Sequence, residues 1–146
     1  MPRYFTVAEA ERVLPEVQRH LEDALFQKNE YQSAHDELEN TLSRIRMQGG
    51  MQVNPVAIRN LKSRRDQSVT KLQEAMGAVD ELGAQVKDLD IGLIDFLILY
   101  QDHEVCLCWK LGEEGIQFWH GIEEGFRGRK PIDSEFLSAH RGDGLQ

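Results

Sequence analysis

The sequence predicts an α+β protein in which a long antiparallel helical hairpin, a coiled coil, precedes a small antiparallel β-sheet. Three observations lead to this fold class. Apolar residues recur at alternating intervals of three and four up to about residue 83. The segment QGGMQVNP, residues 48–55, interrupts that pattern with two glycines and a proline. From about residue 93 onward apolar residues alternate at every second position, which is typical of strands.

The first helix has a clear start signal. Thr6 followed three residues later by Glu9 is a capping box, and the apolar Phe5 precedes it. Pro15 lies too far into the helix for a first-turn proline, so we expect a kink or a restart there. The apolar seam that follows has two polar members, Lys28 and His35. Its positions are Val17, Leu21, Ala24, Lys28, Tyr31, His35, Leu38, Leu42 and Ile45.

The second helix is expected to begin at Pro55, with Asn54 as its cap. Its seam positions are Ile58, Leu61, Arg65, Val69, Leu72, Met76 and Val79. Folding the chain at the glycines pairs positions whose numbers sum to about 103. His35 then lies near Ser68, where a polar seam residue serves to set the register.

After the helices the sequence predicts antiparallel strands joined by short polar turns. The expected strands are residues 92–99, 104–111 and 116–120. The turn YQDH places Leu99 opposite Glu104, and the turn GEEG places Leu111 opposite Ile116.

This register assigns His120 to the core face of the sheet, in the row of Leu107 and Phe96. The opposite face then holds the row of Asp95, Cys108 and Trp119. A slip of one residue in either turn would exchange these assignments.

The domain organisation follows from the same change of period. We expect one domain over residues 1–132, with the helical hairpin at 5–84 and a small β subdomain at 86–132 packed at its base. Residues 133–146 have low hydrophobicity and are expected to form a mobile tail.

Composition and charge narrow the function classes. The chain has 146 residues and a net charge of −8, which disfavours nucleic acid and anionic membranes as partners. No membrane span or secretory signal is visible, so a cytoplasmic protein is expected. Two cysteines one residue apart exclude a disulfide framework. The basic segment 55–71 is expected to pair with an acidic run on the first helix, namely Asp36, Glu37 and Glu39.

Three segments together resemble a known family. They are YFTVAEAERVLPEV, VKDLDIGLIDF and EVCLCWKLGEEGIQFWHGIEEGFRGRKPI, and the likeness extends from Tyr4 to Ile132. The chain resembles a prokaryotic family catalogued only as domain of unknown function 2203. The resemblance implies a short N-terminal motif, a variable charged helical middle and a β-rich end. No activity is established for that family, so the resemblance implies no reaction.

The candidate metal ligands are His120, which ends the last expected strand, and Glu123, which follows it. Further ligands could come from Glu124, His103, Glu104, Asp95 and Cys108. A His-x-x-Glu spacing places both groups on one side of a turn, so a divalent metal is the candidate cofactor. The structural alternative is that His120 ends a buried strand and Glu123 satisfies its hydrogen bonds. A nucleophilic Cys106 or Cys108 with His120 as base is disfavoured by the expected register, and no catalytic residue is assigned.

A second candidate is an anion-binding site built from Arg127, Arg129 and Trp119, since GFRGRKP offers guanidinium groups among glycines. The alternative is that these cations pair with acids of residues 74–124, which hold twelve acidic side chains against two basic ones. Trp119 would then simply cover the sheet.

The sequence first predicts an interaction or scaffolding module that self-associates, because most of the chain forms an elongated helical surface. A homodimer through the helical hairpin, forming a four-helix bundle, is the expected assembly, with a further protein partner that the sequence does not name. The alternative is a small-ligand or divalent-metal binding protein, or a minor enzyme, that uses the His120/Glu123 corner. The sequence leaves open whether the chain is an enzyme, but it favours a protein without catalytic activity because no complete set of catalytic residues is recognisable.

Overall fold

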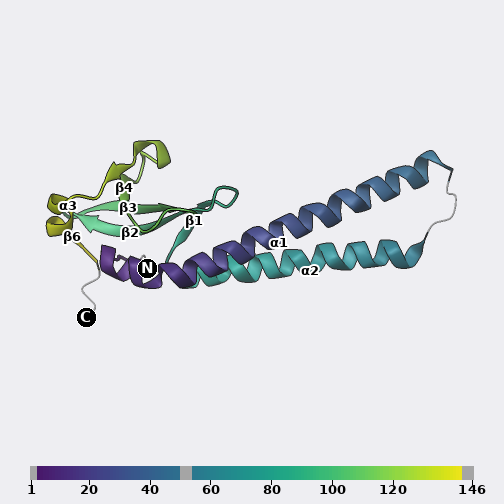
Figure 1. Ribbon diagram of the computed structural model, residues 1–146, viewed down its shortest axis with the longest axis horizontal. Coiled ribbons are helices and arrows are strands. Elements are labelled where there is room, and N and C mark those ends of the chain that lie inside the picture. Colours follow the sequence, from purple (N-terminus) through teal and green to yellow (C-terminus); the bar gives the residue numbers. More distant parts are fainter. Residues whose placement is uncertain (1–2, 50–53, 143–146) are drawn as a thin grey trace. The chain divides into compact units, whose positions relative to one another are not determined.

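The computed structural model describes residues 3–49 and 54–142. It confirms the α+β class, with two long packed helices followed by a small antiparallel sheet (Figure 1). The chain forms two compact units. Unit 1 comprises Met1–Glu22 and Met76–Gln146, and unit 2 comprises Asp23–Ala75. Helices α1 (Val7–Met47) and α2 (Pro55–Glu81) each run through both units.

Both helix starts form as the sequence predicts. The Glu9 N–H donates to Thr6 Oγ1 at 3.1 Å, and the Thr6 N–H donates to Glu9 Oε1 at 3.0 Å. In α2 the first residue is Pro55, and the Asn54 side chain accepts a hydrogen bond from the Val56 N–H at 3.1 Å. The capping box and the asparagine cap therefore satisfy N–H groups that have no partner inside the helix.

Helix α1 continues through Pro15, so the predicted restart is wrong. A proline inside a helix costs about 3 kcal/mol or more through the lost hydrogen bond and ring crowding. Leu14 and Val17, on either side of it, are buried in the core of unit 1. Their packing offsets that cost and keeps the chain helical.

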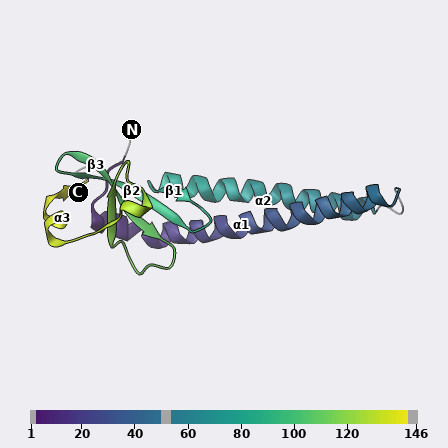
Figure 2. The ribbon, with the colours of Figure 1, turned by 90° about the horizontal axis from the view of Figure 1, so that it is seen from above.

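In unit 2 the two helices run antiparallel (Figure 2), and Figure 1 shows that they spread apart toward the end where the chain connects them. The buried side chains are mostly small: Ala24, Gln27, Ala34 and Leu38 on α1, and Ser68 and Ala75 on α2. Gln27 and Ala34 occupy the buried line where Lys28 and His35 were expected, and the latter two are half-buried. Small side chains thus occupy most of the buried line in unit 2, and bulkier seam residues such as Tyr31 and Leu72 are only half-buried.

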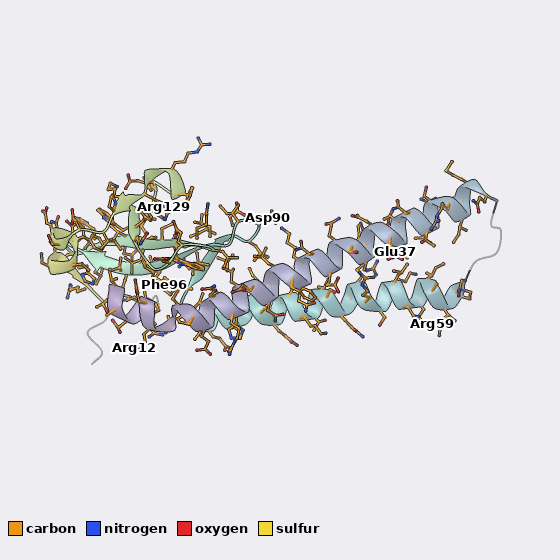
Figure 3. All side chains as sticks on the ribbon, in the orientation of Figure 1. Arg12, Glu37, Arg59, Asp90, Phe96 and Arg129 are labelled. Carbon is orange, nitrogen blue, oxygen red and sulfur yellow. The ribbon has the colours of Figure 1, made fainter. Side chains whose placement is uncertain are left out.

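The predicted pairing of basic and acidic side chains between the helices is confirmed at Arg64. Its guanidinium lies 3.5 Å from a Glu30 carboxylate oxygen and 3.6 Å from one of Glu37 (labelled in Figure 3). Arg64 also donates to Ser33 Oγ at 3.2 Å. These partly exposed ion pairs contribute little to stability individually, but they favour one arrangement of the two helices.

The sheet belongs to unit 1 and is antiparallel throughout, in the order β1-β2-β3-β4-β5, with β6 also pairing with β2. The strands are β1 (Gln85–Asp88), β2 (Leu93–Tyr100), β3 (His103–Lys110), β4 (Phe118–Gly121), β5 (Lys130–Pro131) and β6 (His140–Arg141). A 3-10 helix, η1 (Phe126–Gly128), lies between β4 and β5, and α3 (Ser134–Ala139) precedes β6.

One face of the sheet forms the core of unit 1. Its buried strand residues are Ile94, Phe96, Ile98, Val105, Leu107 and Trp109. The first turns of α1 cover this face, and the Phe5 ring meets the Phe96 ring edge-on at 5.0 Å. Figure 3 shows Phe96 and Arg129 on opposite sides of the sheet. Any polar site on the sheet must therefore lie on the second face.

The predicted register of the first hairpin is confirmed, because Leu99 pairs with Glu104. The register of the second hairpin is wrong by one residue. His120 pairs with Cys106, so its side chain points away from the core face, and Trp119 takes the core side instead.

Contacts outside the hairpin accompany this shift. The Ile116 N–H donates to Glu11 Oε1 of α1 at 3.0 Å, and the Leu111 N–H donates to the Gly92 carbonyl at 3.0 Å. With both groups occupied elsewhere, Leu111 and Ile116 do not pair, and the β3–β4 connection is longer than the expected four-residue turn.

The folded unit extends beyond the predicted boundary at residue 132. Residues 133–142 form α3 and β6, and Phe136 is buried. Its ring stacks on Tyr100 at 4.7 Å and on Trp119 at 4.9 Å. The expected tail therefore packs on unit 1 over these residues; residues 143–146 lie outside the described part of the chain. Within the described residues, neither long helix has an apolar stretch that could cross a bilayer.

Candidate functional site

The observed register brings together three side chains of different chemistry on the second face of the sheet. Asp95 lies on β2, Cys106 on β3 and His120 on β4. One ligand atom from each lies within 4.8 Å of the other two. All three side chains are buried, with exposed fractions of 2%, 4% and 3%. We call this set the three-donor group.

The hydrogen bonds of His120 define the orientation of its ring. Nδ1 lies 2.7 Å from the Gly121 carbonyl oxygen, and Nε2 lies 3.1 Å from Asp95 Oδ1. A carbonyl oxygen only accepts, so Nδ1 carries a hydrogen and donates it. Nε2 is therefore the nitrogen directed toward Asp95.

The two thiols are strongly held in their neutral form. Burial, followed by the negative charge of Asp95, raises the pKa of the Cys106 thiol to about 12. Burial and Asp95 raise the pKa of the Cys108 thiol to about 12 in the same order. In both cases a hydrogen bond to the Asp95 carboxylate adds to the effect. Without a metal, neither thiol is an anion near neutral pH.

The three-donor group forms the floor of a pocket of about 340 Å³. The chain that follows β4 supplies part of the wall through Ile122, Gly125 and Phe126. Gly125 has φ +68°, a left-handed conformation that favours glycine and turns the chain over the sheet. The remaining lining residues come from the strands: Gln85, Lys87, Leu93 and Leu97.

Glu124, and not Glu123, organises the segment after His120. Glu124 Oε1 accepts from the Gly121 N–H at 2.8 Å and from Lys130 Nζ at 2.5 Å. The hydrogen bond from Lys130, with that from Gly121, lowers the pKa of Glu124. Glu123 is exposed and lies outside the three-donor group. In the three-donor group, Asp95 and Cys106 accompany His120.

The three residues of the predicted anion site are not brought together. Arg129 donates to Glu113 Oε2 at 2.5 Å, and its guanidinium lies over the rings of Phe118 and Phe126 at 3.9 and 4.7 Å. Arg127 is exposed on η1, and Trp119 packs on the opposite face of the sheet. Arg129 and Lys130 thus pair with acids of residues 74–124, as the structural alternative expected.

The surroundings of Cys106 and His120 argue against a cysteine nucleophile. Such a residue needs a lowered thiol pKa and a histidine nitrogen free to take its proton. Cys106 has a raised pKa, and both nitrogens of His120 have hydrogen-bond partners. The group therefore lacks the geometry of an activated nucleophile, although the thiols and His120 do share one face of the sheet.

Sequence reasoning identified His120 and named Asp95 and Cys108 among possible further ligands, but it placed His120 on the opposite face of the sheet and did not name Cys106 as a ligand. All three residues stood in the predicted strands, and a shift of one residue in the second turn was enough to separate them. The missing signal was the long-range hydrogen bond from Ile116 to Glu11, whose partners lie 105 positions apart.

Comparison with known proteins places the chain in a family without assigning it a reaction. The sequence model of DUF2203, described as an uncharacterized conserved protein, matches residues 3–132. The chain belongs to this family. No match was found among curated proteins or among solved structures.

Proposed function

We propose that this protein binds one divalent transition-metal ion through Asp95, Cys106 and His120. The observation that supports this function most strongly is the geometry of the three-donor group, with three kinds of ligand atom within 4.8 Å of one another. An imidazole, a thiolate and a carboxylate are the ligands that zinc takes in proteins. A thiolate disfavours magnesium and calcium, which prefer all-oxygen ligands.

The orientation of His120 supports the same function. A metal-bound histidine commonly donates its second N–H to a carbonyl or carboxylate, which holds the ring in place. The 2.7 Å contact between Nδ1 and the Gly121 carbonyl has this form and directs Nε2 toward Asp95 and Cys106. An ion at this position would replace the thiol proton of Cys106.

The test is metal content and zinc affinity of the purified protein. We expect about one equivalent of zinc per chain, measured by elemental analysis and by competition with a chromophoric chelator. His120→Ala and Cys106→Ser are expected to lose at least tenfold in affinity. His103→Ala, an exposed histidine at the start of β3, is the matched control and should bind as the parent does. Circular dichroism checks that each variant is folded. Full zinc affinity in folded His120→Ala would contradict the proposal.

We further propose that the chain self-associates through unit 2, with a second copy of the helical pair as the partner. Phe26 on α1 has an exposed fraction of 59%, and Val56 on α2 one of 56%. Several large seam residues of unit 2 are only half-buried: Tyr31, Leu42, Leu61 and Leu72. Two helices leave such flanks open, and a second pair would cover them in a four-helix bundle.

Sedimentation equilibrium tests this assembly. We expect the parent protein to be a dimer and Phe26→Lys to be a monomer with unchanged helix content, because a charge would replace buried apolar surface. Asn40→Lys adds the same charge at an exposed polar position of α1 and should remain dimeric. A parent protein that is monomeric at micromolar concentration would refute self-association.

Two free cysteines support a reducing compartment, and we infer from them that the protein functions in the cytoplasm. A zinc–thiolate site is compatible with such an environment because the thiols stay reduced.

A further inference from the structure

The three residues of the three-donor group all line the pocket, so a metal ion bound by them would have three protein ligands at the pocket surface. Zinc is four-coordinate in most proteins, and sites with three protein ligands keep the fourth for water or a bound molecule. Within the described residues, the metal-ligating group contains Asp95, Cys106 and His120 only. The pocket of about 340 Å³ above it falls in the size range of small-molecule sites.

The side chains that line the pocket indicate which kind of molecule could bind in it. Leu97, Ile122 and Phe126 line it with apolar side chains, and Ile122 and Phe126 are also exposed to solvent. Apolar walls around a few convergent polar groups are typical of sites for small organic ligands. A ligand would therefore gain binding energy from a short apolar or aromatic body.

The charges around the metal position indicate the charge of the ligand group that would bind there. Asp95 as a carboxylate and Cys106 as a thiolate together balance the two charges of the ion. Lys87 also lines the pocket, at the irregularity in pairing between Val86 and Asp88, and supplies its one cationic side chain among the described lining residues. Asp95 is the one acidic residue among the described residues that line it.

We propose that the pocket binds a small organic monoanion, a carboxylic acid with a short apolar body. The carboxylate occupies the open position of the metal ion and lies in the field of Lys87, while the body contacts Leu97, Ile122 and Phe126. A single lysine matches one negative charge, so the pocket discriminates against nucleotides and other polyphosphates. This inference rests on the proposed metal function.

Cobalt(II) replaces zinc in such sites and gives one optical signal for metal binding and another for ligand binding. Its thiolate charge-transfer absorption reports the bond to Cys106, and its d–d bands report the number and kind of ligands. The probe is benzoate, with benzylamine as a matched compound of opposite charge. We expect benzoate to change the d–d bands with saturation and benzylamine to leave them unchanged.

Lys87→Met should weaken benzoate binding by about fivefold, as expected for a partly screened charge pair. Lys62→Met, an exposed lysine of α2 in unit 2, is the control and should leave benzoate affinity unchanged.

The outcomes separate the two proposals. Charge-transfer absorption without any effect of benzoate overturns the ligand class and leaves the metal site standing. Equal benzoate affinity in Lys87→Met and in the parent also overturns it. The absence of charge-transfer absorption in the folded parent overturns the metal function, and the ligand proposal falls with it.

Discussion

Asp95 is a buried carboxylate surrounded by hydrogen-bonding groups that can each lose a proton. His120 Nε2 lies 3.1 Å away, and the thiols of Cys106 and Cys108 both contact the carboxylate. A buried carboxylate without partners would be costly, so these contacts allow Asp95 to occupy the sheet. The same contacts mean that an ion entering the site must displace protons.

Zinc affinity is therefore expected to rise with pH. The thiol pKa of Cys106 is raised to about 12, so at any lower pH the metal displaces a proton from it. Each displaced proton increases the apparent affinity by about tenfold per pH unit. With the proton of Cys106 displaced, the expected rise in zinc affinity between about pH 6 and about pH 8 is about tenfold per unit.

Competition with a chelator between about pH 6 and about pH 8 measures how steeply zinc affinity rises with pH, after correction for protonation of the chelator itself. Cys106→Ser should have a smaller slope, because the serine hydroxyl is a poor ligand and loses no proton. A slope of zero in the parent would show that Cys106 remains a thiol in the bound state.

At the scale of elements, the first turns of α1 position the β3–β4 connection. Glu11 Oε1 accepts from the Ile116 N–H at 3.0 Å, and Ile116 is buried. The connection also closes on itself, since the Glu113 side chain accepts from the Lys110 N–H at 2.7 Å. The start of β4, and hence the register of His120, depends on these contacts.

Glu11→Ala is expected to lower the free energy of unfolding by about 1–3 kcal/mol, because it leaves the N–H of a buried residue without its partner. Glu11→Gln keeps a carbonyl oxygen and should lose less. Glu16→Ala, an exposed position on the same helix, is the control and should change stability by no more than about 0.5 kcal/mol. Urea unfolding followed by circular dichroism measures all three. An effect of Glu11→Ala no larger than that of Glu16→Ala would show that the contact does not hold the connection.

Two glycines are expected to respond to alanine with opposite signs. Gly77 lies within α2, and an added Cβ would meet nothing within 4 Å. Gly77→Ala should stabilise the protein by about 0.5–1 kcal/mol through helix propensity. Gly92 has φ +67°, and its added Cβ would lie 2.5 Å from Leu111 Cβ.

Gly92→Ala should therefore destabilise by more than about 1 kcal/mol, from backbone strain together with the steric conflict. The midpoints of urea unfolding measure the stability changes of both variants, provided that the dependence of the free energy of unfolding on urea concentration is the same as in the parent. A stabilised Gly92→Ala variant would mean that the turn before β2 can adopt another conformation at little cost.

At the scale of the whole molecule, the chain divides into two units that share both long helices. The three-donor group and its pocket belong entirely to unit 1, and the Arg64 ion pairs belong to unit 2. An ion that binds only the folded site stabilises the elements that supply its ligands. Stability within one chain can therefore differ between the units.

Zinc is expected to slow amide hydrogen exchange in β2, β3 and β4 by at least tenfold and to leave the amides of residues 56–70 in α2 unchanged. Exchange measured by mass spectrometry, with and without one equivalent of zinc, provides the comparison. His120→Ala, which lacks a ligand, should show no zinc effect in either unit. Equal protection of both units would indicate global stabilisation or binding elsewhere.

The sequence by itself determined the structural features that depend on residues close together in the chain. The capping box of Thr6 and Glu9, the Asn54 cap, the lengths of both helices and the YQDH turn are local, so the spacing and type of side chains were enough to predict them. The family resemblance over residues 4–132 pointed to the same layout.

Only the tertiary structure decided which face His120 takes and which side chains accompany it. The β3–β4 connection before His120 is held both by contacts within it, from Lys110 and Trp109 to Glu113, and by the hydrogen bond from Ile116 to Glu11, two residues far apart in the chain. Strand side chains alternate with a period of two, so a shift of a single residue moves a histidine from the core face to the opposite one. Spacing and side-chain type along the chain do not contain the contact between Glu11 and Ile116, because it joins residues that only the tertiary fold brings together.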